Sequence, residues 1–337
     1  MSINYVTDRP YSLRWFRTNF YWFFIVVLYA AWWLFMDSFD RWHLFVHYWE
    51  VSITMIFGSM VAGSTATGGG AVSFPVLTKL LGVSSYDAKL FGLMVQSVGM
   101  SSACIYMWAR KIPILWPVIP PVIIGSTLGI IVSNGIFNDN NTLCKLIFTA
   151  TVTLFMAVLL YSSYFHPRVS LDRVKNFISS RFKEFLLVGF IGGIIAGKVG
   201  SGVDIILFVV LTLVYRIDER LSIPTTIVSM AISSIVGFSY YYFLNDITTK
   251  VFDYWLVSIP VVAIGAPLGA YILQHCHRAH IVYLMAFLIA LDLVSSLLFI
   301  RISSAHVYIL ISFLVVCSFI FVALIRKGDR LHRFAYE

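Results

Sequence analysis

The chain has 337 residues, of which 59% are hydrophobic and only 12% are charged. Soluble domains carry about twice that charged fraction, so the composition excludes a soluble globular protein and indicates a polytopic membrane protein. The net charge of +8 comes from basic residues in loops and tails between apolar segments, which is typical of cytoplasm-facing connections and argues against nucleic acid as a partner. The four cysteines stand singly, without CxxC or metal-ligand spacing, so we expect no metal and no cofactor.

Apolar segments of membrane-spanning length follow one another along the chain. They fall near residues 19–36, 44–62, 88–108, 117–137, 142–164, 184–197, 222–243, 253–274, 280–299 and 304–325. The first segment lacks a small-residue cleavage site, so we expect a retained helix rather than a signal peptide. Two shorter apolar segments, 71–82 and 203–215, follow glycine-rich polar stretches. Because a full crossing needs about 20 residues, each is predicted to be half of a broken helix or re-entrant hairpin.

Lysine and arginine in the short connections predict the orientation. Basic residues gather in the N-terminal arm, at Arg110 and Lys111, and in residues 166–183, 275–280 and 326–333, whereas residues 37–40, 137–141 and 244–253 are poor in net positive charge. Cytoplasmic placement of both termini satisfies nearly all of this pattern and leaves Arg301 as the one basic residue on the outer side. We therefore predict a multi-pass protein with both ends in the cytoplasm.

Residues 63–70, with the sequence GSTATGGG, interrupt an apolar run from residue 44 to residue 83. A glycine in a helix interior costs roughly 1 kcal/mol relative to alanine, and irregular backbone at membrane depth is tolerated only where protein or a watery cavity surrounds it. A related break, GKVGSGVD, occupies residues 197–204. The alternative is that these glycines only allow tight helix packing, but packing alone does not need three glycines in a row. The two breaks therefore predict a site.

The two breaks belong to an internal repeat. A shift of 134 residues places Gly58, Ala62, Gly63, Gly68, Phe74, Val76, Leu77 and Thr78 on Gly192, Ala196, Gly197, Gly202, Phe208, Val210, Leu211 and Thr212. Each copy contains an odd number of segments, so the copies are predicted to be inverted about an axis in the membrane plane, as in many secondary transporters. The predicted organisation is an N-terminal arm and extra helix (1–43), a first transport repeat (44–165), a cytoplasmic linker (166–183), a second, inverted repeat (184–300), and a C-terminal helix with a basic tail (301–337).

The predicted substrate site lies near the membrane midplane, between the two breaks. Half-helices that begin after Gly70 and Val203 point their N-terminal N–H groups and positive dipole ends at the breaks, and glycines let the backbone approach a small anion closely. Polar stripes on the helices that follow either line the pathway or permit close helix contact. The expected substrate-binding residues are Ser64, Thr65, Thr67, Gly68, Gly69, Gly70, Gln96, Lys198, Gly200, Ser201, Gly202, Thr226 and Ser229.

Four ionisable residues in or near the spans carry further expectations. Lys198 is either a snorkelling side chain near the cytoplasmic interface or a positive charge for the anion or a gate. Asp204 is either an ordinary cap of its half-helix or a candidate proton-coupling group or partner of Lys198. Asp292, in the middle of a span, either pairs with a neighbour or titrates during transport, and its place at the end of the repeat favours a structural role. Lys79 is expected at the membrane interface.

The motif Gly58-x4-Gly63-x4-Gly-Gly-Gly-x4-Pro75-x-Leu77 resembles the opening motif of the TauE/SafE family of anion transporters, also called the sulfite exporter family. The second break, the Ile-Gly-x-x-Leu-Gly sequences at residues 124–129 and 264–269, and the two-repeat layout are similar too, over roughly residues 44–300. The resemblance implies an all-helical transporter in the bacterial inner membrane that passes small sulfur-containing or organic anions, such as sulfite, thiosulfate, sulfoacetate or related sulfonates, and that is coupled to protons or the membrane potential.

Carried over residue by residue, the family motif falls on Gly63, Gly68, Gly69, Gly70 and Pro75 in the first copy and on Gly197 and Gly202 in the second. Val203 and Asp204 stand where glycines are more usual, and Val209 takes the place of the proline. A carboxylate beside an anion site favours a proton-coupled or zwitterionic substrate, such as an aminosulfonate.

Two other classes of protein fit parts of the pattern. An anion channel or an anion-binding sensor would need the same glycine-rich site. An intramembrane hydrolase with Ser201 as nucleophile would need a base within hydrogen-bond reach, and the histidines lie near helix ends. The sequence therefore predicts a transporter rather than an enzyme, with a small anion and the lipid bilayer as its partners, and it leaves open whether the protein forms a homo-oligomer.

Overall fold

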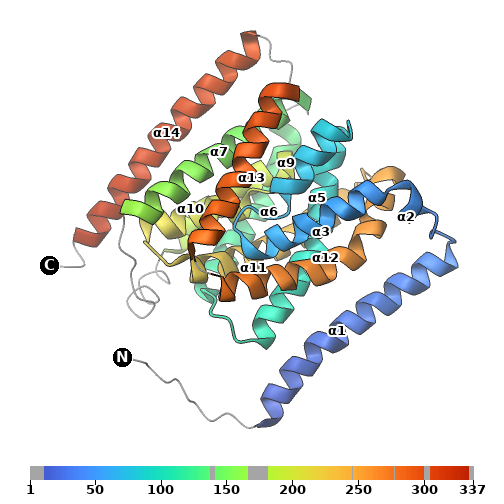
Figure 1. The fold of residues 1–337 in the computed structure, drawn as a ribbon. Helices are drawn as coiled ribbons and strands as arrows, with labels where there is room; N and C mark the ends of the chain where they lie inside the picture. Colours follow the sequence, from blue (N-terminus) through green and yellow to red (C-terminus); the bar gives the residue numbers. More distant parts are fainter. Residues whose placement is uncertain are drawn as a thin grey trace.

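The computed structural model describes residues 11–136, 141–165, 181–244, 246–276, 278–299 and 304–333. Every regular element of these residues is helical (Figure 1). Five helices are long and apolar enough to cross a membrane: Asn19–Ser38, Ser85–Ala109, Trp116–Gly135, Glu219–Phe243 and Thr249–His275. The predicted all-α, multi-pass membrane protein is therefore confirmed. The start of the N-terminal arm, most of the linker 166–183 and Arg301 lie outside the described residues.

The N-terminal half begins with a long helix and continues through two interrupted stretches to a pair of long helices. Its elements are α1 (Tyr11–Ser38), α2 (Leu44–His47), α3 (Trp49–Ser64), α4 (Gly70–Pro75), the π-helical turn η1 (Val76–Leu80), α5 (Ser85–Ala109), the 3-10 turn η2 (Trp116–Val118), α6 (Ile119–Ile136) and α7 (Asn141–Phe165). The predicted single span 44–62 is wrong in one respect: the helix breaks at Tyr48, whose backbone (φ −123°, ψ 34°) is not helical.

The C-terminal half has a similar series of elements. These are α9 (Phe182–Val199), α10 (Val203–Val209), the π-helical turn η3 (Val210–Val214), α11 (Glu219–Phe243), α12 (Thr249–His275), α13 (Arg278–Phe299) and α14 (Ser304–Arg333). The last helix continues through the residues predicted as a basic tail. Its C-terminal end contacts η3, where Gly328 packs against the carbonyl oxygen of Leu213.

The bounds of several elements recur 134 residues apart. The helix α11 begins at Glu219, 134 residues after the start of α5 at Ser85, and both helices have 25 residues. The π-helical turns begin at Val76 and at Val210, which gives the same spacing. The sequence shift therefore corresponds to a recurrence of local structure.

Helices from the two halves cross each other at glycines. The most extensive contacts join α6 to α9 and α12 to α3. Gly125 and Gly129 of α6 lie against the backbone of α9. Gly265 and Gly269 of α12 lie against Ser59 and Met60 of α3. None of these four glycines has room for a methyl group. The glycines of both Ile-Gly-x-x-Leu-Gly sequences thus serve close helix packing, which is the means by which membrane helices gain van der Waals contact.

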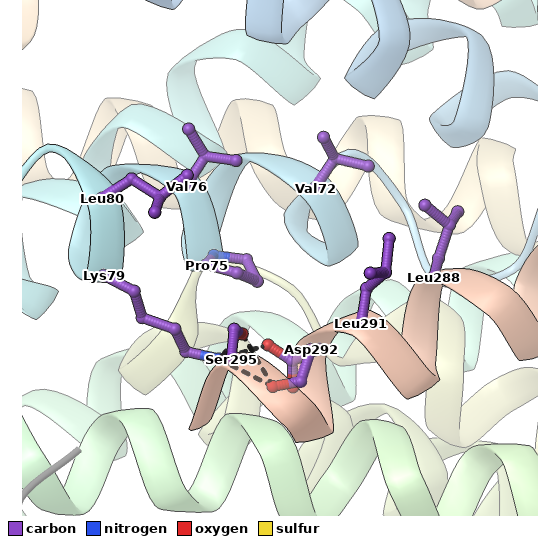
Figure 2. Close-up of a pocket in the computed structure, with 9 residues that line it drawn as sticks. All are labelled: Val72, Pro75, Val76, Lys79, Leu80, Leu288, Leu291, Asp292 and Ser295. Carbon is purple, nitrogen blue, oxygen red and sulfur yellow. Dashed lines mark hydrogen bonds and ion pairs between the residues drawn. The ribbon is translucent and has the colours of Figure 1, made fainter. Parts of the chain in front are cut away.

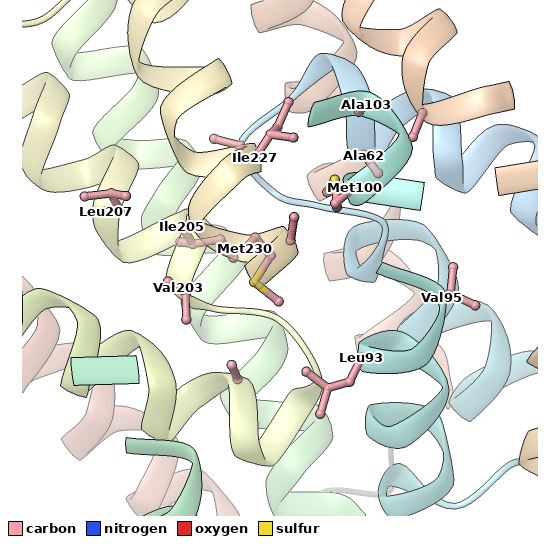
Figure 3. Close-up of a cluster of buried hydrophobic side chains, with 14 of the residues drawn as sticks. Ala62, Leu93, Val95, Met100, Ala103, Val203, Ile205, Leu207, Ile227 and Met230 are labelled. Carbon is pink, nitrogen blue, oxygen red and sulfur yellow. The ribbon is translucent and has the colours of Figure 1, made fainter. Parts of the chain in front are cut away.

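Apolar side chains from both halves meet around the interrupted helices. Ala62 of α3, Met100 of α5, Ile205 of α10 and Met230 of α11 belong to one buried cluster (Figure 3). The helices α1 and α14 lie at opposite edges of the bundle (Figure 1). The first is held by polar contacts as well, because the Trp32 indole donates to the carbonyl oxygen of Leu256 at 2.9 Å. This arrangement encloses residues 65–69 and 200–202 in the interior.

Candidate functional site

The first interrupted segment lies between the end of α3 at Ser64 and the start of α4 at Gly70. Its hydroxyl groups are used locally. Ser64 Oγ donates to the carbonyl of Met60 at 2.8 Å, and Thr65 Oγ1 donates to the carbonyl of Val61 at 2.8 Å and lies 2.9 Å from Thr67 Oγ1. Such bonds compete with the helix ladder and favour its end. Gly68 then takes a left-handed conformation (φ +62°), which glycine adopts without strain.

The second interrupted segment lies between the end of α9 at Val199 and the start of α10 at Val203. Gly200 ends α9 in the left-handed region (φ +80°), and its N–H donates to the carbonyl of Ala196 at 2.8 Å, as is common at helix C-termini. Asp204 Oδ1 accepts hydrogen bonds from the N–H groups of Gly202 (3.1 Å) and Ile205 (2.9 Å). Asp204 thus accepts from N–H groups at the start of α10, as expected for a carboxylate in the first turn, while the N-cap position itself is Gly202.

The two interrupted segments face each other at two pairs of residues. A methyl group added to Gly70 would lie 2.5 Å from Ser201 Oγ, and one added to Gly68 would lie 2.6 Å from Asp204 Oδ2. These distances leave no space for a side chain at Gly68 or Gly70. The backbone at these two glycines therefore lies directly against the side chains of Ser201 and Asp204.

Gln96 of α5 joins this contact from a third element. Its Nε2 donates to the carbonyl of Gly200 at 3.2 Å, and its Oε1 accepts from Ser234 Oγ of α11 at 3.4 Å. The position 134 residues later holds Met230, which belongs to the apolar core. The two halves of the chain therefore differ at this position, with an amide in the first and a thioether in the second.

Two buried polar atoms of the site have no hydrogen-bond partner among the described residues: Ser201 Oγ and Asp204 Oδ2. Buried polar groups nearly always have a partner, and one left without costs about 1–3 kcal/mol. Both atoms lie beside the glycine backbone of the first segment. Together they mark a place where a small polar ligand or water would find hydrogen bonds.

Other predicted site residues lie with their side-chain groups directed elsewhere. The Cβ direction of Gly69 points at α3, with Ala62 Cβ and the carbonyl of Gly58 both 3.6 Å away. In α11, Thr226 Oγ1 donates to the carbonyl of Ile223 at 2.8 Å and Ser229 Oγ to that of Thr225 at 3.0 Å, so both hydroxyls are used within their own helix. Their contribution to a site stays a prediction.

Lys198 lies in the last turn of α9 and is only 5% exposed. Its side chain is therefore inside the protein, which contradicts the interpretation as a snorkelling lysine, since snorkelling places the ammonium in water.

Two glycines from the family motif also serve packing. Gly63 lies against the backbone of Ala266, and a methyl group on Gly197 would lie 2.7 Å from Ser133 Cβ.

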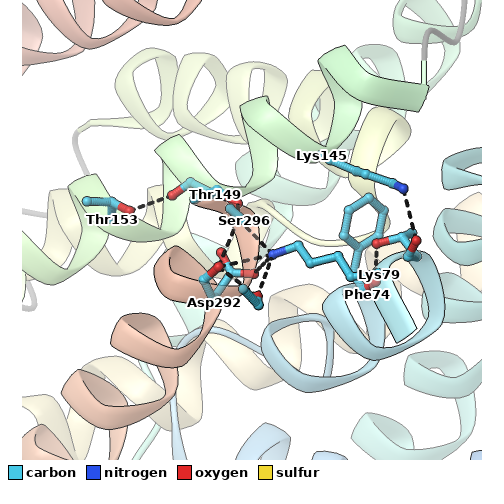
Figure 4. Close-up of polar contacts among 9 residues, drawn as sticks. Phe74, Lys79, Lys145, Thr149, Thr153, Asp292 and Ser296 are labelled. Atoms are coloured by element: carbon cyan, nitrogen blue, oxygen red, sulfur yellow. Dashed lines mark hydrogen bonds and ion pairs between the residues drawn. The ribbon is translucent and has the colours of Figure 1, made fainter. Parts of the chain in front are cut away.

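The prediction for Lys79 is wrong, because its side chain is 1% exposed and forms an ion pair with Asp292, Nζ to Oδ1 2.6 Å (Figure 4). The expectation that Asp292 pairs with a neighbour is thereby confirmed. The ion pair borders a pocket of about 260 Å³ between α4–η1 and α13, lined mainly by Val72, Pro75, Val76, Leu80, Leu288 and Leu291 (Figure 2). The sequence shows the two opposite charges in or beside apolar segments, where each needs a partner, but it does not show that they pair with each other.

No base lies within hydrogen-bond reach of the Ser201 hydroxyl in the described residues. Its Oγ has no hydrogen-bond partner there, whereas a nucleophilic serine needs a base within reach. Groups of three or more histidine, cysteine, aspartate or glutamate side chains suited to a metal ion are also missing from these residues.

The fold and this site define a multi-pass helical membrane protein with a small buried polar site between two interrupted helices. Residues 51–295 match the family described as Sulfite exporter TauE/SafE, over more than half of the chain. The protein belongs to this family of membrane transporters, as the sequence motifs predicted. Searches of curated proteins and of solved structures find no significant match. The helices α1 and α14 lie outside the matched residues.

Proposed function

We propose that this protein is a secondary transporter that moves a small sulfur-containing or organic anion across the bacterial inner membrane by alternating access. The observation that carries the proposal is the contact of Gly68 and Gly70 with Asp204 and Ser201, where two buried polar atoms have no partner among the described residues. Backbone N–H groups and glycines suit a small oxyanion. Export is the direction implied by the family.

The proposed architecture is a pair of inverted repeats, residues 44–165 and 184–300, with the site near the midplane between them. The recurrence of α5, η1 and α4 as α11, η3 and α10 supports two copies of one unit. The odd number of segments in each copy and the basic connections support inversion with both termini in the cytoplasm. In such transporters each copy contributes one broken helix to a single site.

Asp204 is the proposed proton-coupling residue. One of its oxygens is held by two backbone N–H groups, and the other lies beside Gly68 without a partner in the described part of the chain. An ionised Asp204 carboxylate would repel an anion bound beside it, whereas a protonated one can donate a hydrogen bond to that anion. The geometry therefore favours an anion that enters the site together with a proton on Asp204.

Ligand-induced thermal stabilisation of the purified protein tests this proposal. The panel contains sulfite, thiosulfate, sulfoacetate, an aminosulfonate and small carboxylates, each measured at several pH values. A ligand at 100 times its Kd stabilises the folded state by about 2.7 kcal/mol, so a true substrate gives a clear upward shift of the unfolding temperature. We expect a sulfur-containing anion to produce it, more strongly at lower pH. The absence of a shift with every anion would contradict the proposal.

A further inference from the structure

The ion pair between Lys79 and Asp292 joins the half-helix α4–η1 to α13 inside the bundle. Lys79 Nζ also lies 3.1 Å from the carbonyl oxygen of Asp292 and 2.7 Å from Ser296 Oγ (Figure 4). It lies 3.0 Å from Ser295 Oγ (Figure 2). All four acceptors belong to a single turn of α13. The ammonium group is therefore fixed in position on that helix by several directional bonds.

The same polar cluster reaches α7. Ser296 Oγ lies 2.6 Å from Thr149 Oγ1 of α7, and Lys145 Nζ of the same helix donates to the carbonyl oxygen of Thr78 in η1 at 2.9 Å (Figure 4). Three elements distant in sequence are thus joined at one place. The cluster determines where the C-terminal end of the half-helix 70–80 lies relative to α7 and α13.

The local fold does not require this ion pair. The position 134 residues after Lys79 is Leu213, which lies in the corresponding π-helical turn η3. The two turns have the same length, and Leu213 is buried without any charge. A leucine is therefore sufficient to form and bury this turn, and Lys79 needs another explanation.

Stability does not explain the pair either. Taking two charges into a protein interior costs several kcal/mol each, and replacement of a buried ion pair by apolar residues is often neutral or stabilising. In addition, Asp292 Oδ2 is buried without a hydrogen-bond partner among the described residues. Unlike an apolar contact of leucine, the ion pair depends on direction. With four acceptors around the Lys79 ammonium, it fixes both the rotation and the axial position of the half-helix.

This position matters because the same half-helix begins at Gly70, nine residues before Lys79. At that end the chain passes Ser201 and Asp204 with no space even for a methyl group. A rotation or slide of the half-helix by about 1 Å would therefore change the geometry of the candidate site. Misplacement of this size can lower the efficiency of an active site about 100-fold.

We propose that Lys79 and Asp292 are positioning residues that clamp the half-helix α4–η1 onto α13 and thereby hold Gly68 and Gly70 in place at the substrate site. The part that concerns the substrate rests on the proposed transport function. Because separating the two charges inside the bundle is costly, the pair stays closed, and α4–η1 and α13 move as one body.

The decisive variant is the double replacement Lys79→Met with Asp292→Leu, which removes both charges and keeps apolar volume. We expect its unfolding temperature to equal or exceed that of the wild type, while amide hydrogen exchange in residues 70–80 becomes faster. Residues 203–214 serve as an internal control and should exchange as in the wild type. The apparent affinity for the stabilising anion should fall about tenfold or more.

Further variants keep the test informative. Each single replacement leaves a buried charge without its partner and should lower the unfolding temperature. The charge-swapped variant, Lys79→Asp with Asp292→Lys, should restore slow amide hydrogen exchange in residues 70–80. Arg41→Met with Asp253→Asn removes a more exposed ion pair and should leave both readouts unchanged. Wild-type exchange and affinity in the double variant would overturn the clamp. If no anion binds the wild-type protein, the transport proposal fails, and the exchange measurement still decides the clamp.

Discussion

The replacement Gly70→Ala tests whether the two interrupted segments form one site. The added methyl group would lie 2.5 Å from Ser201 Oγ and 3.0 Å from Ser201 Cβ, well inside van der Waals contact. Rotation of the serine hydroxyl relieves only the first contact, so the segments must move apart by several tenths of an ångström. Overpacking of this kind costs about 1–3 kcal/mol. If the strain is borne by the ligand-binding state, the affinity for the anion falls roughly 5-fold to 140-fold, since 1.4 kcal/mol is a factor of ten.

The neighbouring glycine provides the matched control. A methyl group on Gly69 would meet its nearest atoms at 3.6 Å, and its backbone (φ −66°, ψ −17°) is one that alanine adopts, so Gly69→Ala should leave affinity unchanged. The second change Ser201→Gly removes both crowded atoms and should restore part of the stability lost in Gly70→Ala. The assay is anion-induced thermal stabilisation, repeated as flux in proteoliposomes. Equal behaviour of Gly70→Ala and Gly69→Ala would refute the reasoning.

Three further replacements test single features of the site. Asp204→Asn keeps the acceptor for two N–H groups but cannot exchange a proton, so net flux should lose its pH dependence while anion exchange continues; unchanged pH dependence would leave Asp204 with its capping role alone. Gln96→Met places a thioether at this position, as in Met230, and leaves the buried carbonyl of Gly200 without this donor, so the folded state should lose about 1–3 kcal/mol. Apparent affinity for the anion should fall as well, whereas wild-type affinity would exclude Gln96 from the site. Gly200→Ala puts alanine in a left-handed conformation (φ +80°), with its methyl group 2.7 Å from the carbonyl oxygen of Lys89. The free energy of unfolding should fall by about 1–2 kcal/mol or more, which lowers the unfolding temperature. Gly58→Ala, with contacts of 3.4 Å or more, should not show this drop.

Sequence reasoning located the helices and the interruptions because both depend on local physics. Long apolar runs predict spans, and the glycines of residues 63–70 and 197–204 predict where helices stop. The structure ends α3 at Ser64 and α9 at Val199, within the two predicted breaks. The 134-residue shift of the sequence recurs in the helix bounds for the same reason, since similar local sequences form similar local structure.

The sequence did not reveal which way each residue of the breaks points. Gly68 and Gly70 face the other segment, whereas Gly69 faces α3, and this depends on the rotation of a half-helix that only tertiary packing determines. The hydroxyls of Ser64, Thr226 and Ser229 were predicted to bind substrate, yet each donates to a carbonyl of its own helix. Serine and threonine in helices commonly form this bond, which a pattern of polar residues does not distinguish from a pathway lining.

The sequence also could not predict the contacts between helices that are distant along the chain. Lys79 and Asp292 are 213 residues apart, and no periodicity connects them. The C-terminal end of α14 likewise binds the second half through ion pairs of Lys327 with Glu184 (2.8 Å) and of Arg216 with Asp329 (2.7 Å). The sequence gives the charges, but only the packed bundle shows which charges meet.

The most direct test of the account is counterflow in proteoliposomes that contain the purified protein. Vesicles loaded with unlabelled anion are diluted into a trace of the same labelled anion, chosen as the one that stabilises the protein most. A transporter with the proposed site accumulates label transiently above equilibrium, and its initial rates saturate with anion concentration. Gly70→Ala raises the anion concentration that gives the half-maximal rate, whereas Gly69→Ala leaves it unchanged. Flux that rises linearly with concentration and shows no overshoot would contradict alternating access and indicate a channel.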